Sequence, residues 1–314
     1  MTVALSSRPS SHGSARAAGT FLRQNARASF GLILLLLFGA VALLGPSFVA
    51  APDALLGLPH QAPSWAHWLG TTGQGQDVLA QTVVGTRLSL LIGLGVGLST
   101  VVWGALVGMA AGYFGERTDA VLSLITNVFL VIPGLPLAIV LAAYLPAGPL
   151  SVALVLVITG WAWNARVLRA QTLALRQRDF VSAAVVSGES SGWIIVREVL
   201  PNMLTIIVAQ LIGSTIYAIG AEVGLEFLGL GDLSTVTWGT NLYWASNDSA
   251  LLTGAWWTYL PSGLCVALVG FALVMLNSGF DQVTNPRLRA ESRWRSTLLG
   301  RGISLGRSTP VVPS

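Results

Sequence analysis

Residues 88–112 read LSLLIGLGVGLSTVVWGALVGMAAG and hold no charged side chain. A transmembrane helix needs about 20 mostly apolar residues, because each residue advances about 1.5 Å through a hydrocarbon layer about 30 Å thick. Charged side chains near the centre of a span are costly and therefore rare. This stretch predicts a helix that crosses a membrane.

Five further stretches are equally apolar and uncharged, at 30–50, 120–145, 149–165, 203–221 and 259–280. Of the 314 residues, 53% are hydrophobic and only 10% are charged. Soluble domains carry about 25% charged residues, so an ordinary water-soluble protein is excluded. We predict an all-α membrane protein with six transmembrane helices.

The arginines predict the orientation of these helices, because all 17 basic residues are arginine. With six spans, all of them except Arg87 fall on the side that holds both chain ends. The positive-inside rule makes that side cytoplasmic, so both termini are expected there. The expected organisation is a cytoplasmic tail 1–29, a first helix 30–50, an extracytoplasmic segment 51–87, a core 88–280 with five helices and a cytoplasmic segment 166–202, and a cytoplasmic tail 281–314.

The first span could also be a signal peptide, because Arg23 and Arg27 precede an apolar run that ends near Ala51. The run is longer than the 7 to 15 residues typical of the apolar part of such a peptide. The leader before it is also too long for the basic part. We therefore expect a span that is not cleaved.

The composition excludes several chemistries. Without lysine the chain cannot contain a P-loop, whose lysine reaches the nucleotide phosphates. It has one cysteine and three histidines, all three histidines before residue 68, so no metal-site spacing is present and no catalytic residue is proposed. If ATP drives this protein, another subunit must bind the ATP.

Small residues and prolines mark places where helices are expected to pack closely or bend. Glycines one turn apart let helix backbones approach each other in lipid, and the second span carries Gly93, Gly97, Gly104, Gly108 and Gly112. We expect packing within the bundle more than a subunit interface. In the third span Pro133, Gly134 and Pro136 predict a kink at mid-membrane depth, which would suit a gate.

No span carries a charge at depth, unlike the proton- or sodium-coupled carriers, in which intramembrane carboxylates are expected. Glu222, at the outer end of the fifth span, is the nearest candidate. We expect it to face water at the membrane interface, and an ion site is the alternative.

The segment 166–202 has the pattern of two short helices. An acidic start at Asp179 and a glycine at Gly188 bound the first one, and the second one is expected to end at Pro201. Apolar side chains crowd the first helix from Phe180 to Val186. Since exposed apolar patches are seldom left bare, this segment is expected to bind a partner.

Ala183-Ala184, then Gly188, then Leu200-Pro201 resembles the "EAA" motif of ABC importer permeases, in which Glu-Ala-Ala-xxx-Gly is followed by Leu-Pro. In that family the short helix docks on the ATP-binding subunit. The resemblance implies ATPase-coupling roles for Asp179, Phe180, Val181, Ser182, Ala183, Ala184, Gly188, Leu200 and Pro201. Ser182 stands where glutamate is usual, and Asp179 or Glu189 could supply the missing charge.

Other blocks are similar to the peptide and nickel branch of these permeases, at 69–79, 85–90, 111–115, 226–231, 238–239 and 285–289. Together they cover about residues 25 to 290. Thr72 and Gln76 replace an aspartate and an arginine of the branch in the first block.

The resemblance implies a type I ABC importer permease fold in a bacterial inner membrane. It implies four kinds of partner: a second homologous permease subunit, two ATPase subunits that bind ATP and Mg, an extracytoplasmic binding protein, and membrane lipid. Neither a cofactor on this chain nor nucleic acid is implied. The expected cargo is a di- or oligopeptide. A nickel complex or another small solute is the alternative, and a self-contained channel or secondary carrier is a further one.

Overall fold

The computed structural model describes residues 25–284. Within this range the regular elements are helices, and the pairing of extended backbone is limited to two isolated bridges, Leu55 with Gln76 and Thr71 with Asp77. The prediction of an all-α protein is confirmed. Most of the two predicted tails, and the block at 285–289, lie outside the described residues.

Between residues 25 and 284, five helices are long and apolar enough to cross a membrane. They coincide with the first, second, fourth, fifth and sixth predicted spans. Their bounds are α2 Ala26–Leu44, α3 Val78–Phe114, α6 Pro149–Arg176, α9 Leu200–Phe227 and α11 Leu260–Thr284.

The third predicted span is two helices rather than one kinked helix. Helices α4 (Glu116–Val131) and α5 (Gly134–Tyr144) meet at an angle of 86°. Ile132 and Pro133 between them are extended, and proline at 133 offers no backbone N–H to continue the first helix. The number of spans is six if this pair counts as one broken span.

Helix bounds differ from the predicted spans because a hydropathy run marks only the apolar part of a helix. Helix α3 begins at Val78, ten residues before the predicted start, where the Asp77 carboxylate accepts a hydrogen bond from the Ala80 N–H at 2.9 Å. Helix α6 continues to Arg176, so 11 residues of the predicted segment 166–202 belong to it.

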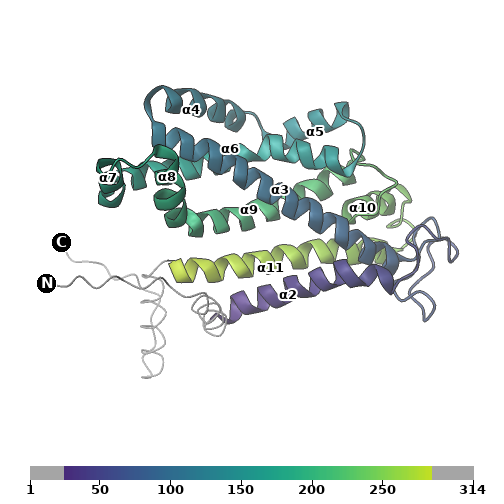
Figure 1. Ribbon diagram of the computed structural model, residues 1–314. Helices are drawn as coiled ribbons and strands as arrows, with labels where there is room; N and C mark the ends of the chain where they lie inside the picture. Colours follow the sequence, from purple (N-terminus) through teal and green to yellow (C-terminus); the bar gives the residue numbers. More distant parts are fainter. Residues whose placement is uncertain (1–24, 285–314) are drawn as a thin grey trace, which may run out of the picture.

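The shorter elements gather at opposite ends of the bundle (Figure 1). Helices α7 (Asp179–Val186) and α8 (Ser191–Ile194) lie at one end. Helix α10 (Trp238–Asn247) and the connection between α2 and α3 lie at the other. The structure thus separates the segments that the sequence assigns to the two sides of the membrane.

Helix α3 is the centre of the packing and contacts α6 and α9 along its length. Helices α2 and α11 run side by side beneath α9 in the view of Figure 1. Among the described residues, three buried clusters connect the long helices. One joins α3, α5, α6 and α9, a second joins α3, α6 and α9 to α7 and α8, and a third joins α2, α9 and α11 around Trp238.

Candidate functional site

Helix α7 rests on the bundle through a single buried side chain. Val181 is 2% exposed and lies in a cluster with Leu168 of α6, Ile194 of α8 and Met203 of α9. The last turn of α7 is open, with Val185 55% and Val186 88% exposed. The apolar residues predicted as one patch are therefore divided between an anchor and an outward face.

The remaining α7 residues singled out by the motif lie around this anchor. Ala184 is half-buried and packs on the same cluster, whereas Asp179, Phe180, Ser182 and Ala183 are exposed. The Ser182 hydroxyl, in place of the usual glutamate, donates to the backbone carbonyl of Arg178 at 3.5 Å. The outer face of α7 is thus a mixed apolar and polar surface.

Gly188 ends α7 in a tight turn. Its φ is +81°, in the left-handed region that favours glycine. The Gly188 N–H donates to the Val185 carbonyl at 3.0 Å, and the Glu189 N–H donates to the Ala184 carbonyl at 3.2 Å. This pair of bonds is the Schellman pattern of helix ends. Gly188 therefore fixes where α7 stops and where the chain turns towards α8.

The second short helix does not end at Pro201, contrary to the prediction. Residues Ile195–Val199 form a π-helical turn that leads directly into α9, with Pro201 in the first turn of α9. The wider turn accommodates a proline that lacks an N–H, and the Asn202 side-chain amide donates to the Glu198 carbonyl at 2.7 Å. Helix α8 is thus joined to α9 without a break, and Leu200 packs against the cluster that holds Val181.

The glycines of α3 lie against two different helices. A Cβ atom at Gly104 or Gly108 would come within 2.5 Å of α6 atoms, Asn164 Cβ and the Ala165 carbonyl oxygen respectively, and one at Gly112 within 2.7 Å of Thr172 Cβ. A Cβ atom at Gly93 would meet Ile219 of α9. A Cβ atom at Gly97 would meet Thr215, which also belongs to α9. The five glycines therefore mediate packing between helices of this chain.

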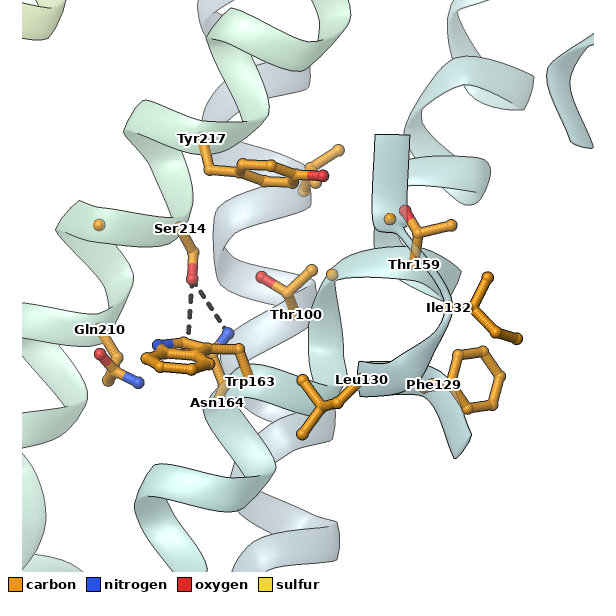
Figure 2. A pocket seen from close by; sticks show the side chains of 14 residues that line it. Thr100, Phe129, Leu130, Ile132, Thr159, Trp163, Asn164, Gln210, Ser214 and Tyr217 are labelled. Carbon is orange, nitrogen blue, oxygen red and sulfur yellow. Dashed lines mark hydrogen bonds between the residues drawn. The ribbon is translucent and has the colours of Figure 1, made fainter. Parts of the chain in front are cut away.

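A cavity of about 440 Å³ lies beside the break between α4 and α5. Its wall includes Ile132 and Gly134 at the break. Three further helices contribute to the wall: α3 through Thr100, α6 through Trp163 and α9 through Tyr217 (Figure 2). Of the three residues predicted to form the kink, Gly134 is part of the cavity wall and Pro133 lies between two lining residues, whereas Pro136 does not line the cavity.

The cavity wall combines polar and apolar side chains and is uncharged. Asn164 of α6 donates its side-chain amide hydrogen to the Ser214 hydroxyl of α9 at 3.0 Å, and Gln210 lies one turn before Ser214 (Figure 2). None of the described residues that line the cavity is Asp, Glu, Arg or His. Such a wall offers hydrogen-bond donors, acceptors and aromatic faces, but no counter-charge.

Sequence reasoning did not single out Asn164, Gln210, Ser214, Trp163 or Tyr217. All five belong to predicted spans. Asn164 and Gln210 carry a usable signal, because polar side chains in a span usually face the bundle interior. The pairing of residues 50 positions apart could not be deduced from one sequence.

Glu222 does not face water, so that expectation is wrong. Its side chain is fully buried and accepts a hydrogen bond from the Ser89 hydroxyl of α3 at 3.1 Å. A group of three metal-binding side chains is absent from the part of the chain that the structure describes.

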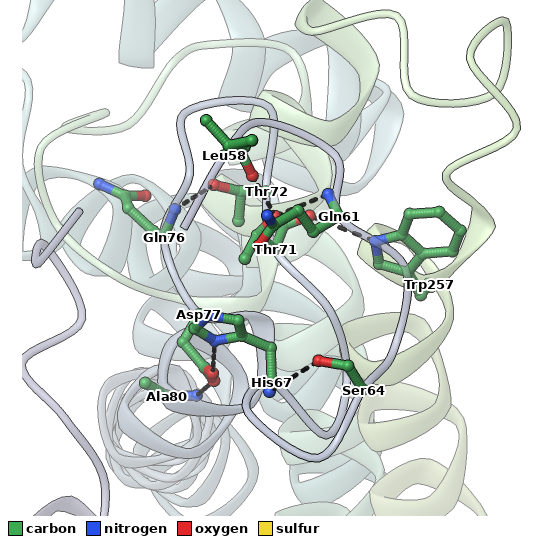
Figure 3. A network of polar contacts seen from close by, with 10 residues as sticks. All are labelled: Leu58, Gln61, Ser64, His67, Thr71, Thr72, Gln76, Asp77, Ala80 and Trp257. Carbon is green, nitrogen blue, oxygen red and sulfur yellow. Dashed lines mark hydrogen bonds and ion pairs between the residues drawn. The ribbon is translucent and has the colours of Figure 1, made fainter. Parts of the chain in front are cut away.

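The connection between α2 and α3 is folded by a network of polar contacts (Figure 3). His67 pairs with Asp77 at 2.9 Å, and the indole N–H of Trp257 donates to the Thr71 carbonyl at 3.2 Å. Thr72 and Gln76 are joined by a hydrogen bond from the Gln76 N–H to the Thr72 hydroxyl at 3.1 Å. Uncharged groups thus connect the two positions where the resemblance has an aspartate and an arginine.

Comparison with known proteins defines the class of this membrane protein. Residues 104–290 match the model of the family described as "Binding-protein-dependent transport system inner membrane component". The match spans more than half of the chain, and the chain belongs to this family. It is a multi-pass protein of the bacterial inner membrane with the type I permease fold.

Three relatives show the branch of the family. The chain is 30% identical over 272 residues to the oligopeptide transport system permease protein OppC of Bacillus subtilis, covering 85% of this chain and 88% of the relative. It is 32% identical over 273 residues to the dipeptide transport system permease protein DppC of the same species, covering 85% and 84%. It is 30% identical over 272 residues to DppC of Alkalihalophilus pseudofirmus, covering 86% and 88%.

Proposed function

We propose that this chain is one of two homologous permease subunits of an ATP-driven importer of di- or oligopeptides. The observation that carries the proposal is the placement of α7. The exposed helix α7 is anchored by Val181 in a buried cluster that includes Met203 of α9, and α9 also lines the cavity. The names of the relatives, which are permeases for dipeptides and oligopeptides, support the cargo.

The arginines at the two ends of the bundle indicate how the chain is oriented in the membrane. Arg176, Arg178 and Arg197 belong to the end that carries α7, and Arg87 belongs to the start of α3, towards α10. The positive-inside rule therefore makes the α7 end cytoplasmic. Two ATPase subunits, which bind ATP and Mg, would hold α7, and a binding protein would deliver substrate at the α10 end.

Coupling would use two connections between α7 and α9. Val181 of α7 packs in one buried cluster with Met203 of α9, and the π-helical turn at Ile195–Val199 joins α8, which follows α7 after the turn at Gly188, directly to α9. Movement of α7 with the ATPase subunits would displace Gln210, Ser214 and Tyr217 in the cavity wall. The equilibrium between inward and outward access would then follow the state of the ATPase pair.

The uncharged wall favours peptides of varied sequence. A peptide backbone presents amide donors and acceptors that Asn164, Gln210 and Ser214 match, whatever its side chains carry. A naked metal ion would find neither carboxylate nor imidazole ligands among these residues. A nickel complex with an organic ligand remains an outcome of the test.

Reconstitution in vesicles tests the proposal. The chain is combined with its companion permease, ATPase subunits and binding protein, and uptake of a radiolabelled dipeptide is measured with and without ATP. ATP-dependent accumulation is expected. Accumulation of a nickel complex in place of the peptide would overturn the cargo. Passage without the ATPase subunits would overturn the importer and favour a channel or secondary carrier.

A further inference from the structure

Two glutamates lie one turn apart near the C-terminal end of α9. Glu222 is fully buried and Glu226 is 1% exposed. An ionised carboxylate is costly to bury unless a cation or several donors compensate its charge. Among the described residues neither glutamate has an ion-pair partner. Something other than an ion pair must therefore compensate the cost of burying the two carboxyl groups.

The pair stands where three helices meet. The Ser89 hydroxyl of α3 donates to Glu222 Oε1 and accepts a hydrogen bond from the Trp238 backbone N–H of α10 at 3.1 Å. The hydroxyl of Thr237, the residue that caps α10, donates to Glu226 Oε2. Both carboxyl groups thus hold the start of α10 against α3 and α9.

One oxygen of the pair has no partner. Glu222 Oε2 is buried and makes no hydrogen bond with the described residues. Glu222 and Glu226 are four residues apart on α9, which places their Cβ atoms about 5–6 Å from each other on one face of the helix. Two ionised carboxylates at this distance repel, and neither can donate. A proton between them supplies the missing donor and removes one charge.

Close packing around Glu226 leaves little space for a hydrated cation. A Cβ atom at Gly239 would come within 2.6 Å of Glu226 Oε2, and one at Gly231 within 2.8 Å of Glu226 Cγ. The backbone of the α9–α10 connection at Gly231 and that of α10 at Gly239 therefore lie close to the Glu226 side chain. A proton is the cation that fits.

Other titratable groups around the pair do not compensate its charge. Arg87 of α3 is exposed, and Asp232 accepts hydrogen bonds from Ser234. Tyr243 of α10 lies against Gly229. Helices α2 and α11 contribute apolar side chains around Trp238, and α5 and α6 contribute apolar side chains around Leu225.

We propose that Glu222 and Glu226 form a proton-binding site whose shared proton holds α10 against α3 and α9. This inference rests on the proposed function, in which α10 belongs to the extracytoplasmic face. Loss of the proton places two negative charges in a buried site and weakens the contact. Because the docked state binds the proton more tightly than the undocked state, docking is complete at low pH and is lost as the pH rises. Between the pH at which the undocked state loses the proton and the higher pH at which the docked state loses it, the docking equilibrium weakens about tenfold per pH unit, and above that range it is constant.

Infrared spectroscopy of the purified chain tests the proton directly. The wild type is compared with the double variant Glu222→Gln/Glu226→Gln for the stretching band of a protonated carboxyl group. We expect the wild type to show a band that the variant lacks and that disappears as the pH rises. Asp232→Asn removes a carboxylate at the same end that accepts hydrogen bonds from Ser234, and it should leave the band unchanged. Identical spectra of the wild type and the double variant at every pH would overturn the proposal.

Peptide uptake by the complete reconstituted transporter tests the consequence. The double glutamine variant stays neutral at every pH, so its uptake should lose the fall at high pH that the wild type shows. Equal pH profiles of wild type and variant would overturn the role in holding α10. Absence of uptake by the wild type at every pH would instead contradict the proposed function, and the infrared result would still decide whether the proton is bound.

Discussion

Val181 of α7 and Met203 of α9 belong to the same buried cluster. Met203 is followed, two and three turns along α9, by Gln210 and Ser214 in the cavity wall. With a rise of 1.5 Å per residue, the helix carries a displacement from Met203 to Ser214 over about 16 Å. The surface proposed to bind the ATPase subunits is therefore connected to the proposed substrate path by one continuous helix.

Truncation of the anchor should loosen α7. Val181→Ala removes two buried carbon atoms, which costs about 1.5 kcal/mol at about 0.8 kcal/mol for each. Hydrogen–deuterium exchange of residues 179–190 in the purified chain should therefore become about tenfold faster. Val186→Ala is the matched control on the exposed face and should leave the exchange unchanged. Equal rates in the wild type and Val181→Ala would show that Val181 does not anchor the helix.

The turn after α7 should tolerate only glycine. Gly188→Ala forces a side chain into the left-handed region, at a cost of roughly 1–2 kcal/mol. We expect lower peptide-stimulated ATPase activity in the reconstituted transporter. Gly192→Ala, four residues later in α8 and in open space, is the control and should retain wild-type activity. Equal activities of both variants would contradict a role for the turn.

Close contact between α3 and α6 should make Gly108 sensitive to size. A Cβ atom there would lie 2.5 Å from the Ala165 carbonyl oxygen, so Gly108→Ala must move one of the two backbones. Overpacking of this kind costs about 1–3 kcal/mol. The Tm in detergent should fall by several degrees, whereas Gly95→Ala, on the same helix with no atom within 4 Å, should not lower it. An unchanged Tm for Gly108→Ala would refute the close approach.

Cavity volume should limit transport. Ser214→Leu adds bulk inside a space of about 440 Å³, and we expect peptide uptake to fall at least tenfold while the ATPase subunits still co-purify. Ser214→Ala removes the hydrogen bond with Asn164 but adds no volume, so uptake should stay within about threefold of the wild type. If Ser214→Leu transports normally, the cavity is not on the substrate path.

Local patterns in the sequence predict much of this structure. Uncharged apolar runs locate the long helices, and Asp179 and Gly188 mark the two ends of α7. Pro133 marks the change of direction, although a single proline does not reveal that the chain turns by 86°.

The features that could not be predicted depend on contacts between residues far apart in the sequence. The burial of Glu222 depends on Ser89, which lies 133 residues earlier, and that of Glu226 depends on the cap of α10 at Thr237. The division of α7 into a buried Val181 and an exposed Val186 depends on how α7 rests on α6, α8 and α9. Periodicity within one short helix cannot decide which face meets the bundle.

Site-specific cross-linking at α7 tests the central claim most directly. In a Cys265→Ser background, which leaves no other cysteine, Val186→Cys places a thiol on the outer face of α7 and Leu252→Cys places one in the exposed segment after α10. With a thiol-to-amine cross-linker, Val186→Cys should capture the ATP-binding subunit in the assembled transporter, with a yield that changes when ATP is added, and Leu252→Cys should not. Capture of that subunit by Leu252→Cys and not by Val186→Cys would contradict the account.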